Sequence, residues 1–341
     1  MTLTTGPDAG CTPRAPAELS GAWSRLAERR TPASIFLTPE WIAVAREHDR
    51  AEPVTLAVGD PPVGIAALAR DADGTLRFAG GEFTDEQDVV APAGEERSVA
   101  AAVARWIASE APPRVRLEFV PEDAPTLEVM ASALGARGYR AVRSRLIASP
   151  RLGLPGDFDT FVQRLGKKER HELRRKVRRL ENATEATFRW AAGSASGSGS
   201  GSGSGTDAER AATLDRFFAL HRLSRGAKAD FMTPDMERFF RDIADALAPL
   251  GRLRLGVLRA HDEDAAVLFA FAYRGTLALY NAAYDPALAS LSIGIVSHAW
   301  AIREAIAEGF DTYDLLRGDE PYKYDLGGKD RWLGRLEATL P

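Results

Sequence analysis

The sequence predicts a mixed α/β protein (α+β mixed sheets) built from two tandem domains, and three observations support this. Short apolar strands alternate with amphipathic helices along the chain. A hairpin, a third strand, a helix and a further strand recur in that order in both halves, with residues 54–119 matching residues 253–316, which indicates an internal duplication. The length of 341 residues is enough for two domains that each bury a core.

The first half is predicted to hold a tail and lead-in helix over residues 1–30, then an N-terminal domain over residues 31–150. Leu19, Trp23 and Leu26 recur at helical spacing in the lead-in segment. Strands are predicted from alternating or continuous apolar runs that end at Gly, Pro or Asp. The expected elements are a helix begun at Thr38 and Pro39, a hairpin over 53–71, a strand at 75–80, a helix near 98–110, a strand at 115–120, a helix near 124–137 and a strand near 140–148.

The second half, residues 151–341, is predicted to be the C-terminal domain that carries the active site. Within it, residues 193–205 form a Gly/Ser run, read as a flexible linker with an r.m.s. span of roughly 20 Å. Helices are expected from their 3.6-residue periodicity and strands from apolar runs. The expected elements are helices near 157–182, 207–224, 234–247 and 292–309, and strands at 186–191, 253–260, 265–274, 276–284, 312–317 and 332–339.

Composition excludes several classes of function. The formal charge of -4 argues against general nucleic-acid affinity. The only cysteine, Cys11, lies in the predicted tail and cannot form an internal disulfide, and no residue spacing indicates a metal site. No apolar run is long enough for a membrane span and the first residues lack a signal-peptide pattern, so we expect a cytoplasmic protein.

The predicted helix at 292–309 begins with the best candidate for an anion site. Ser292 is a favoured N-cap residue, and Gly294 would let a ligand approach the backbone. The first N–H groups of a helix lack partners and carry a positive dipole end, which suits phosphate. An ordinary capped helix without ligand is the alternative. The matching position of the first half carries the acidic segment 82–97, whose charge would repel phosphate, so we expect the first domain to lack a cofactor.

Charged residues are dense after the strand predicted at 312–317. Arg317, Asp319, Glu320, Tyr322 and Lys323 could supply an acid, a base and hydrogen bonds beside the anion site. They could equally form a buried salt-bridge network that braces the end of the strand.

Residues 167–179 form a strongly basic run with eight Lys or Arg against two Glu. Such a run is often a solvated helix face, but the shortage of acidic partners favours a phosphate-bearing ligand or RNA. His221 lies on an apolar helix, where a histidine is more often structural than catalytic. Arg225 follows it in a basic, glycine-containing loop of the kind that often covers a substrate.

These segments together resemble the GNAT acyltransferase superfamily. The resemblance rests on KKERHELRRKVRRLE, LHRLSR, ALYNAAYDP, SIGIV and especially YDLLRGDEPYKY, and it covers residues 36–339 as two tandem GNAT-like folds. The most similar branch is the CelD-like group of cellulose biosynthesis, related to the Fem aminoacyltransferases that build peptidoglycan bridges. That family has Ser-Pro-Gly at the cap, where this chain has Ile293 in place of the proline.

The resemblance implies an acyl-CoA donor, such as acetyl-CoA, and no metal. The pantetheine of this donor would pair with the strand end at Ala283 and Tyr284. The pyrophosphate of the donor would bind the amides of Ser292, Ile293, Gly294, Ile295 and Val296. The acceptor would be an amine on a small, anionic molecule, phosphorylated or sugar-linked. It would lie between the two halves and contact Arg170, His171, Arg174, His221, Arg225, Arg317 and Lys323.

Acyl transfer to an amine needs a base, donors for the tetrahedral oxyanion and an acid for the leaving thiolate. The predicted base is Glu320 or Asp319, and Tyr322 is the predicted acid or substrate ligand. Two alternatives stay open: a Fem-like transfer of an amino acid from charged tRNA, with the basic run as RNA contact, and a non-catalytic duplicated fold that binds an anion or a partner.

Overall fold

The computed structural model describes residues 10–192, 206–224 and 230–341, and the predicted linker 193–205 lies outside these ranges. The chain divides into two compact units, which are described separately. Unit 1 comprises Met1–Ala148 and Arg331–Pro341, and unit 2 comprises Ser149–Asp330. Each unit has its own mixed sheet flanked by helices, which confirms the predicted α/β fold class.

Unit 1 is organised around a seven-stranded sheet in the order β1-β2-β3-β4-β5-β13-β6. Neighbouring strands are antiparallel except β4 and β5, which are parallel and meet at Leu76 and Val115. The strands are β1 (Cys11–Pro13), β2 (Glu52–Val58), β3 (Gly64–Arg70), β4 (Leu76–Phe78), β5 (Arg114–Pro121), β6 (Arg140–Ala148) and β13 (Trp332–Thr339).

The core of unit 1 forms where helices cover this sheet. On α3, Val99, Val103 and Ile107 recur at helical spacing and pack with Leu56 and Leu68 of the sheet, all fully buried. The helices of unit 1 are α1 (Pro16–Arg29), α2 (Pro39–His48), α3 (Glu96–Glu110) and α4 (Thr126–Gly135), with 3-10 turns at η1 (Ile35–Leu37) and η2 (Gly81–Phe83).

Unit 2 is organised around a six-stranded sheet in the order β7-β12-β11-β10-β9-β8. Among the strands that the structure describes in this sheet, β11 and β12 are parallel and all other neighbours are antiparallel. The strands are β7 (Arg151–Gly153), β8 (Thr187–Ala192), β9 (Leu253–Ala260), β10 (Glu263–Tyr273), β11 (Thr276–Tyr284) and β12 (Thr312–Asp314).

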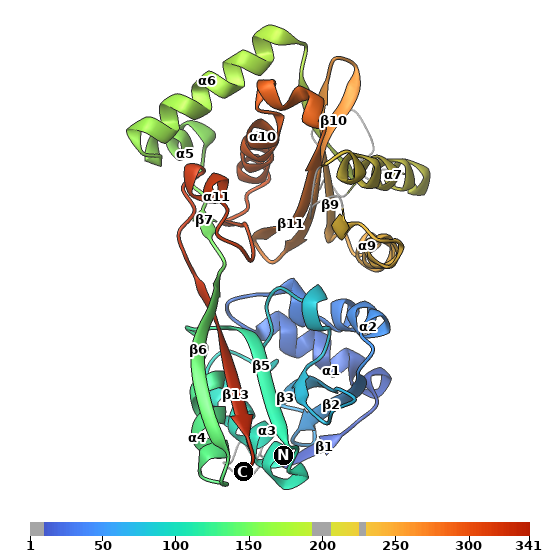
Figure 1. Cartoon of the computed structure of the whole chain (residues 1–341), viewed down its shortest axis with the longest axis vertical. Helices are drawn as coiled ribbons and strands as arrows, with labels where there is room; N and C mark the ends of the chain where they lie inside the picture. The colour runs from blue at the N-terminus through green and yellow to red at the C-terminus, as the bar shows by residue number, and fades with distance from the viewer. Residues whose placement is uncertain (1–9, 193–205, 225–229) are drawn as a thin grey trace. The chain divides into compact units, whose positions relative to one another are not determined.

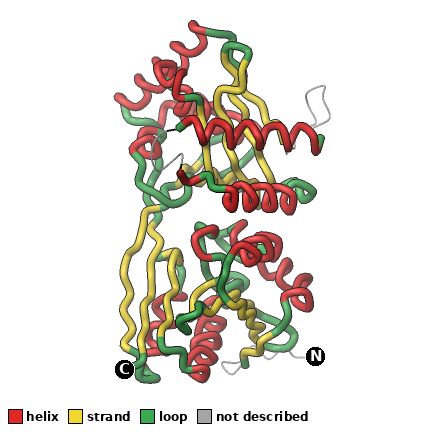
Figure 2. Tube along the Cα trace, turned by 45° about the vertical axis from the view of Figure 1, so that its right-hand side comes forward, coloured by secondary structure: helices red, strands yellow, loops and turns green. Residues whose placement is uncertain are grey.

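Helices cover both faces of the unit 2 sheet, as Figures 1 and 2 show. An aromatic cluster that includes Phe217, Phe240 and Phe269 holds α7 and α9 on one face. On the other face, Ala299 and Ile302 of α10 share a core with Phe161 of α5. These helices are α5 (Phe158–Arg164), α6 (Lys167–Ala183), α7 (Asp207–Leu223), α9 (Pro234–Leu247), η3 (Pro286–Leu291), α10 (Ile293–Ala307) and α11 (Pro321–Asp325).

Several predicted boundaries need correction. The helix predicted at 157–182 is two helices, because Leu165 adopts extended backbone and Gly166 is also non-helical between α5 and α6. Cys11 lies in β1 opposite Val58 rather than in a tail, and α1 belongs to unit 1. The strand β13 lies in the sheet of unit 1, between β5 and β6, so residues 331–341 do not belong to the second domain as predicted.

The two units repeat one order of elements, β2-β3-β4-α3-β5 in unit 1 and β9-β10-β11-α10-β12 in unit 2. The aligned stretches also end in the same unusual conformation. Phe119 in β5 has φ 57° and Leu316 after β12 has φ 56°. A left-handed backbone is uncommon for residues other than glycine, so its presence at the last residue of each aligned stretch supports a duplication.

Candidate functional site

The parallel pair in unit 2 opens shortly after it begins. β12 pairs with β11 only from Thr276 to Ala278, whereas β10 pairs with β11 along its whole length to Tyr284. The strand predicted at 312–317 is shorter than expected and ends at Asp314. Among the described residues, no strand pairs with this second edge of β11 from Leu279 onward. The edge therefore presents backbone N–H and C=O groups to a ligand.

A β-bulge lies in β11 where the two strands separate. The register shifts between Leu279 and Asn281 and leaves Tyr280 without an opposite residue. As a result, two successive side chains of β11 contact the helices on the same face of the sheet. The Tyr280 ring packs on Phe240 of α9, and Asn281 contacts His221 of α7. The bulge thus turns a polar side chain toward α7 beside the open edge.

Asn281 connects His221 to the backbone of β11. Its Oδ1 lies 2.8 Å from His221 Nε2 and accepts the Ala282 N–H at 2.7 Å. His221 is 1% exposed, so a ligand could not contact the imidazole directly in this arrangement. Sequence reasoning missed Asn281, although an amide in the middle of the apolar run TLALYNAAY was a signal, because a polar group there needs a partner.

The start of α10 differs from the predicted cap. Ser292 stands at the N-cap position, but its backbone is left-handed with φ 59° and its hydroxyl makes no capping hydrogen bond. The 3-10 turn η3 leads into this residue, and Asp285 caps η3 instead. The first helical bond runs from Val296 N–H to the Ser292 carbonyl. The amides of Ile293, Gly294 and Ile295 therefore have no partner within the helix, and no acidic residue occupies the first turn.

Gly294 lies against the ring of Tyr284. A Cβ placed on Gly294 would come within 3.3 Å of two ring carbons of Tyr284. The neighbouring residues predicted to bind the donor differ in exposure. Ala283, Ile293 and Val296 are buried, while Tyr284 is 36% exposed. The structure thus brings the end of β11 and the first turn of α10 together. The Tyr284 ring is exposed there, and Ser292, Gly294 and Ile295 are half-buried.

The loop after β12 is held by a buried ion pair. Asp314 is 2% exposed and lies 2.6 Å from Arg151 Nε of β7. Its other oxygen accepts the Leu316 N–H at 2.9 Å. Leu316 has a left-handed backbone, which costs energy for a branched residue, so these contacts fix a strained turn.

Lys323 is the centre of a second set of contacts in this loop. Its Nζ donates to the carbonyls of Leu316, Arg317 and Gly318 at 3.0, 2.6 and 3.2 Å, and lies 2.9 Å from Glu320. The side chain is 3% exposed. Its ammonium is therefore committed to acceptors within the loop, which favours the bracing alternative for Lys323 over substrate contact.

The two candidate bases lie at the surface of the same loop. Glu320 is the N-cap residue of α11 and its side chain is 55% exposed, while Asp319 is exposed beside it. The Glu320 carboxylate folds over Gly318, which has φ 114°, so that a Cβ there would come within 2.5 Å of Glu320. This glycine therefore allows the observed position of the carboxylate.

Tyr322 stacks on His298 of α10, with ring centroids 5.0 Å apart and nearly parallel planes. Burial raises the pKa of Tyr322, and the Glu320 carboxylate raises it further. Burial also raises the pKa of Tyr313, whose hydroxyl has no hydrogen-bond partner among the described residues. Both phenols stay protonated at neutral pH and can only donate or accept hydrogen bonds.

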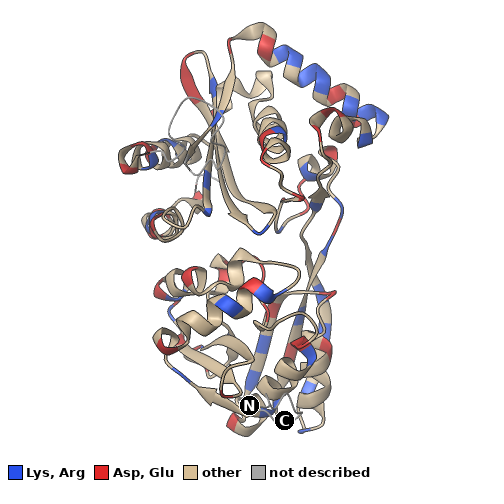
Figure 3. Ribbon diagram, turned by 180° about the vertical axis from the view of Figure 1, so that it is seen from behind, with Lys and Arg blue, Asp and Glu red and all other residues tan. Residues whose placement is uncertain are grey.

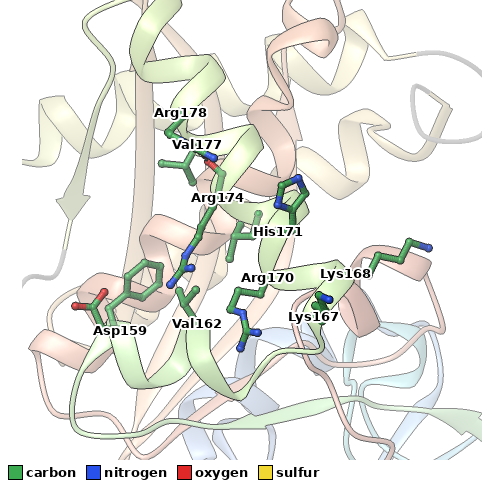
Figure 4. A pocket seen from close by; sticks show the side chains of 11 residues that line it. Asp159, Val162, Lys167, Lys168, Arg170, His171, Arg174, Val177 and Arg178 are labelled. Atoms are coloured by element: carbon green, nitrogen blue, oxygen red, sulfur yellow. Dashed lines mark hydrogen bonds between the residues drawn. The ribbon is translucent and has the colours of Figure 1, made fainter.

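The basic run forms the exposed helix α6, visible as a row of blue residues in Figure 3. Arg170, His171 and Arg174 all line one groove between α5 and α6 (Figure 4). Arg317 is half-buried in the loop after β12. Arg225 lies outside the described residues.

Two kinds of site are absent from the described part of the chain. No group of three or more His, Cys, Asp or Glu side chains within it could hold a metal ion. None of its helices combines the length and apolar character that crossing a membrane requires.

Part of unit 2 matches a known family model. Residues 167–324, from the start of α6 to α11, match the model described as acetyltransferase (GNAT) domain. No curated protein matches the chain.

Solved structures with low sequence identity share the fold. They include FemX, with 12% identity, 97% of each chain covered and a TM-score of 0.66. A conserved protein of unknown function from Bacteroides thetaiotaomicron has 12% identity, covers 97% of this chain and 99% of its own, and has a TM-score of 0.61. A tandem GNAT protein from the clavulanic acid biosynthesis pathway has 12% identity, 98% and 99% coverage and a TM-score of 0.54. The fold is therefore a tandem GNAT-like fold.

Proposed function

From a tandem GNAT-like fold whose residues 167–324 match a GNAT acetyltransferase domain, we propose that the protein is an acyl-CoA-dependent N-acyltransferase. The observation that carries the proposal is the open edge of β11 beside the uncapped first turn of α10. An acyl-CoA has an amide-rich arm that can pair with a strand edge and a pyrophosphate that suits helix amides. Both features lie next to each other in unit 2.

The backbone of β11 offers donors on the open edge. The Asp285 N–H donates to Ala265 on β10, so by alternation the amides of Ala282 and Tyr284 point to the other edge. The Ala282 amide is bound by Asn281, so we assign the pantetheine contact to the strand end at Tyr284. The pyrophosphate would bind the amides of Ile293, Gly294 and Ile295, with the Tyr284 ring beside them.

The loop after β12 would supply the proton transfers. An acceptor amine attacks the thioester carbonyl, the C–N bond forms and the C–S bond breaks. The amine proton passes to Glu320 or Asp319, directly or through water, and from there to the leaving CoA thiolate, which departs as a thiol. Tyr322, which stays protonated at neutral pH, is suited to donate a hydrogen bond to the leaving sulfur or to the acceptor. Lys323 holds this loop in place, and Asn281 positions His221. Membership of the CelD-like branch stays a prediction.

A thermal-shift titration with acetyl-CoA, longer acyl-CoAs and free CoA tests the donor. At one hundred times the dissociation constant, binding adds about 2.7 kcal/mol, or roughly 5 to 10 °C for a chain of this size. The shift should disappear in Gly294→Leu, whose side chain would displace Tyr284. If no CoA compound shifts the melting temperature of the unsubstituted protein, the proposal is wrong.

Glu320→Gln tests the base. We expect turnover to fall at least about tenfold, with an unchanged acetyl-CoA shift, since the Glu320 side chain is exposed and Gln keeps its size. Asp319→Asn is the matched comparison. Unchanged turnover in Glu320→Gln would exclude Glu320 as base and leave Asp319.

A second candidate is transfer of an amino acid from charged tRNA, favoured by the basic helix α6 and by the structural likeness to FemX. It predicts strong RNA binding that weakens steeply with salt and is lost when the α6 cations are replaced. A response to neither CoA nor RNA would favour the non-catalytic alternative, a duplicated fold that binds an anion or a partner.

A further inference from the structure

The groove between α5 and α6 combines an apolar floor with a cationic wall. It encloses about 1020 Å³. Its floor consists of Phe158, Val162, Leu173 and Val177, of which Val162 and Leu173 are buried. Figure 4 shows Arg170 and Arg174 extending from α6 into the space above α5. The groove therefore offers both an apolar surface and positive charge to one ligand.

The cations of the groove lack acidic partners. No ion pair within the described residues involves Lys167, Lys168, Arg170, Arg174 or Arg178, and Asp159 is the one carboxylate in the lining. Arg170 donates to the Gln163 carbonyl at 3.1 Å, and Arg178 donates to the Arg174 carbonyl at 3.3 Å. These contacts orient two guanidinium groups without neutralising them, so a bound anion would gain charge-assisted hydrogen bonds.

The groove is distinct from the proposed donor site. On the opposite flank of α6, Arg179 donates to the Ser290 carbonyl of η3 at 2.9 Å, next to the start of α10. Arg179 and Arg170 are nine residues apart, which is about two and a half helical turns and places them on opposite sides of the helix. Arg170 and Arg174 therefore lie on a different face of α6 from the residue that contacts η3.

We propose that this groove binds an amphiphilic phosphate, a molecule with one phosphate group attached to an alkyl chain. The phosphate would contact Arg170 and Arg174, which lie one helical turn apart, and the chain would cover the floor. An inorganic phosphate would leave the floor unused, and a neutral chain would leave the guanidinium groups unpaired. The ligand's role as acyl acceptor rests on the proposed function, but its binding does not require a donor.

Calorimetric titration of the full chain with monomeric alkyl phosphates tests this. Affinity should rise about two- to fourfold per methylene from butyl to octyl phosphate, until the floor is covered. Octyl phosphate should bind at least tenfold more tightly than either inorganic phosphate or octyl glucoside. Equal affinity for octyl phosphate and inorganic phosphate would overturn the proposal, as would binding only to vesicles that contain phosphatidic acid, because that would indicate a membrane surface contact.

Two variants and a control locate the ligand. Arg170→Gln with Arg174→Gln should weaken octyl phosphate at least tenfold, and Phe158→Ser should reduce the gain per methylene. Lys176→Gln removes one charge from the same helix outside the groove and should leave the affinity within twofold. The acetyl-CoA shift should persist in the double variant, which separates failure of this site from failure of the donor site. Undiminished octyl phosphate binding in the double variant would refute the assignment.

Discussion

The two units connect their third strand to the following helix in different ways. In unit 1, residues 79–95 link β4 to α3, and Thr84–Asp88 are all buried. Asp88 lies 2.8 Å from Arg30 and accepts a hydrogen bond from Thr126 at 2.5 Å, and Glu86 pairs with Arg331. In unit 2, residues 285–292 link β11 to α10 through η3, and the backbone of both elements stays accessible.

This difference suggests a physical reason why only one of the two units would bind a donor. The sequence suggested that acids in segment 82–97 would repel a phosphate, but Asp88 and Glu86 are paired with arginines and buried. Their partners are Arg30, Arg331 and the Thr126 hydroxyl, so these acids are already engaged within unit 1. We infer that unit 1 lacks a cofactor because its connection is closed by its own ion pairs, and that unit 2 is the reactive unit because its connection is not.

Breaking the closed connection should have the largest effect. Arg30→Met leaves Asp88 buried without its cation, and loss of one partner of a buried pair costs about 3 to 5 kcal/mol. Guanidinium unfolding followed by tryptophan fluorescence measures this. Arg97→Met, in an exposed pair with Glu128, is the control and should cost less than about 1 kcal/mol. A small effect in Arg30→Met would show that the connection is not held by this pair.

The brace in unit 2 should give the next largest effect. Lys323→Met leaves three carbonyls and Glu320 without their donor, at a cost of about 2 to 4 kcal/mol. The free energy of unfolding of unit 2 should fall by that amount, whereas Lys329→Met, with no ion pair among the described residues, should change it by less than about 0.5 kcal/mol. Wild-type stability in Lys323→Met would restore Lys323 as a candidate substrate contact.

A smaller, pH-dependent effect is expected where the closed connection begins. Asp49 accepts the Gly80 N–H at 3.0 Å and binds Arg77. Burial alone would raise the pKa of Asp49, but the hydrogen bonds from Arg77 and backbone amides outweigh it and lower the pKa below its ordinary value. A lowered carboxyl pKa stabilises the fold above the unfolded pKa, and this contribution is lost as pH falls through the folded pKa.

Asp49→Asn should therefore cost about 2 kcal/mol at pH 7, and the gap to wild type should narrow below about pH 4. Unfolding curves between pH 3 and 7 measure both values. A gap that stays constant over this range would contradict the assignment of Asp49 as an ionised anchor.

The smallest effect on stability is expected at the open connection. Gly294→Ala gains up to about 1 kcal/mol of helix propensity, and the Tyr284 ring must shift by a few tenths of an ångström. The melting temperature should change by less than about 4 °C, while acetyl-CoA affinity falls. A large loss of stability would mean that Gly294 serves packing rather than ligand access.

The sequence predicted the fold class correctly, whereas several local features around the candidate site have no signal in it. Continuous apolar runs identified β9, β10 and β11, because buried strands carry that pattern. It could not reveal that Lys323 is buried, since the acceptors are backbone carbonyls that have no sequence signal. The bulge at Tyr280 and the left-handed backbone of Ser292 also have no sequence signal. Both depend on strand register and on neighbouring elements rather than on residue type.

The placement of β13 has a consequence for biosynthesis. β6 and β13 are adjacent in the sheet of unit 1, yet the ribosome makes all of unit 2 between them. Unit 2 can acquire its structure while unit 1 still lacks a strand between β5 and β6. Until β13 is made, the edges of β5 and β6 in nascent unit 1 therefore stay unpaired. Unpaired edges favour aggregation, so unit 1 is the part of the chain that would most need protection by chaperones during translation.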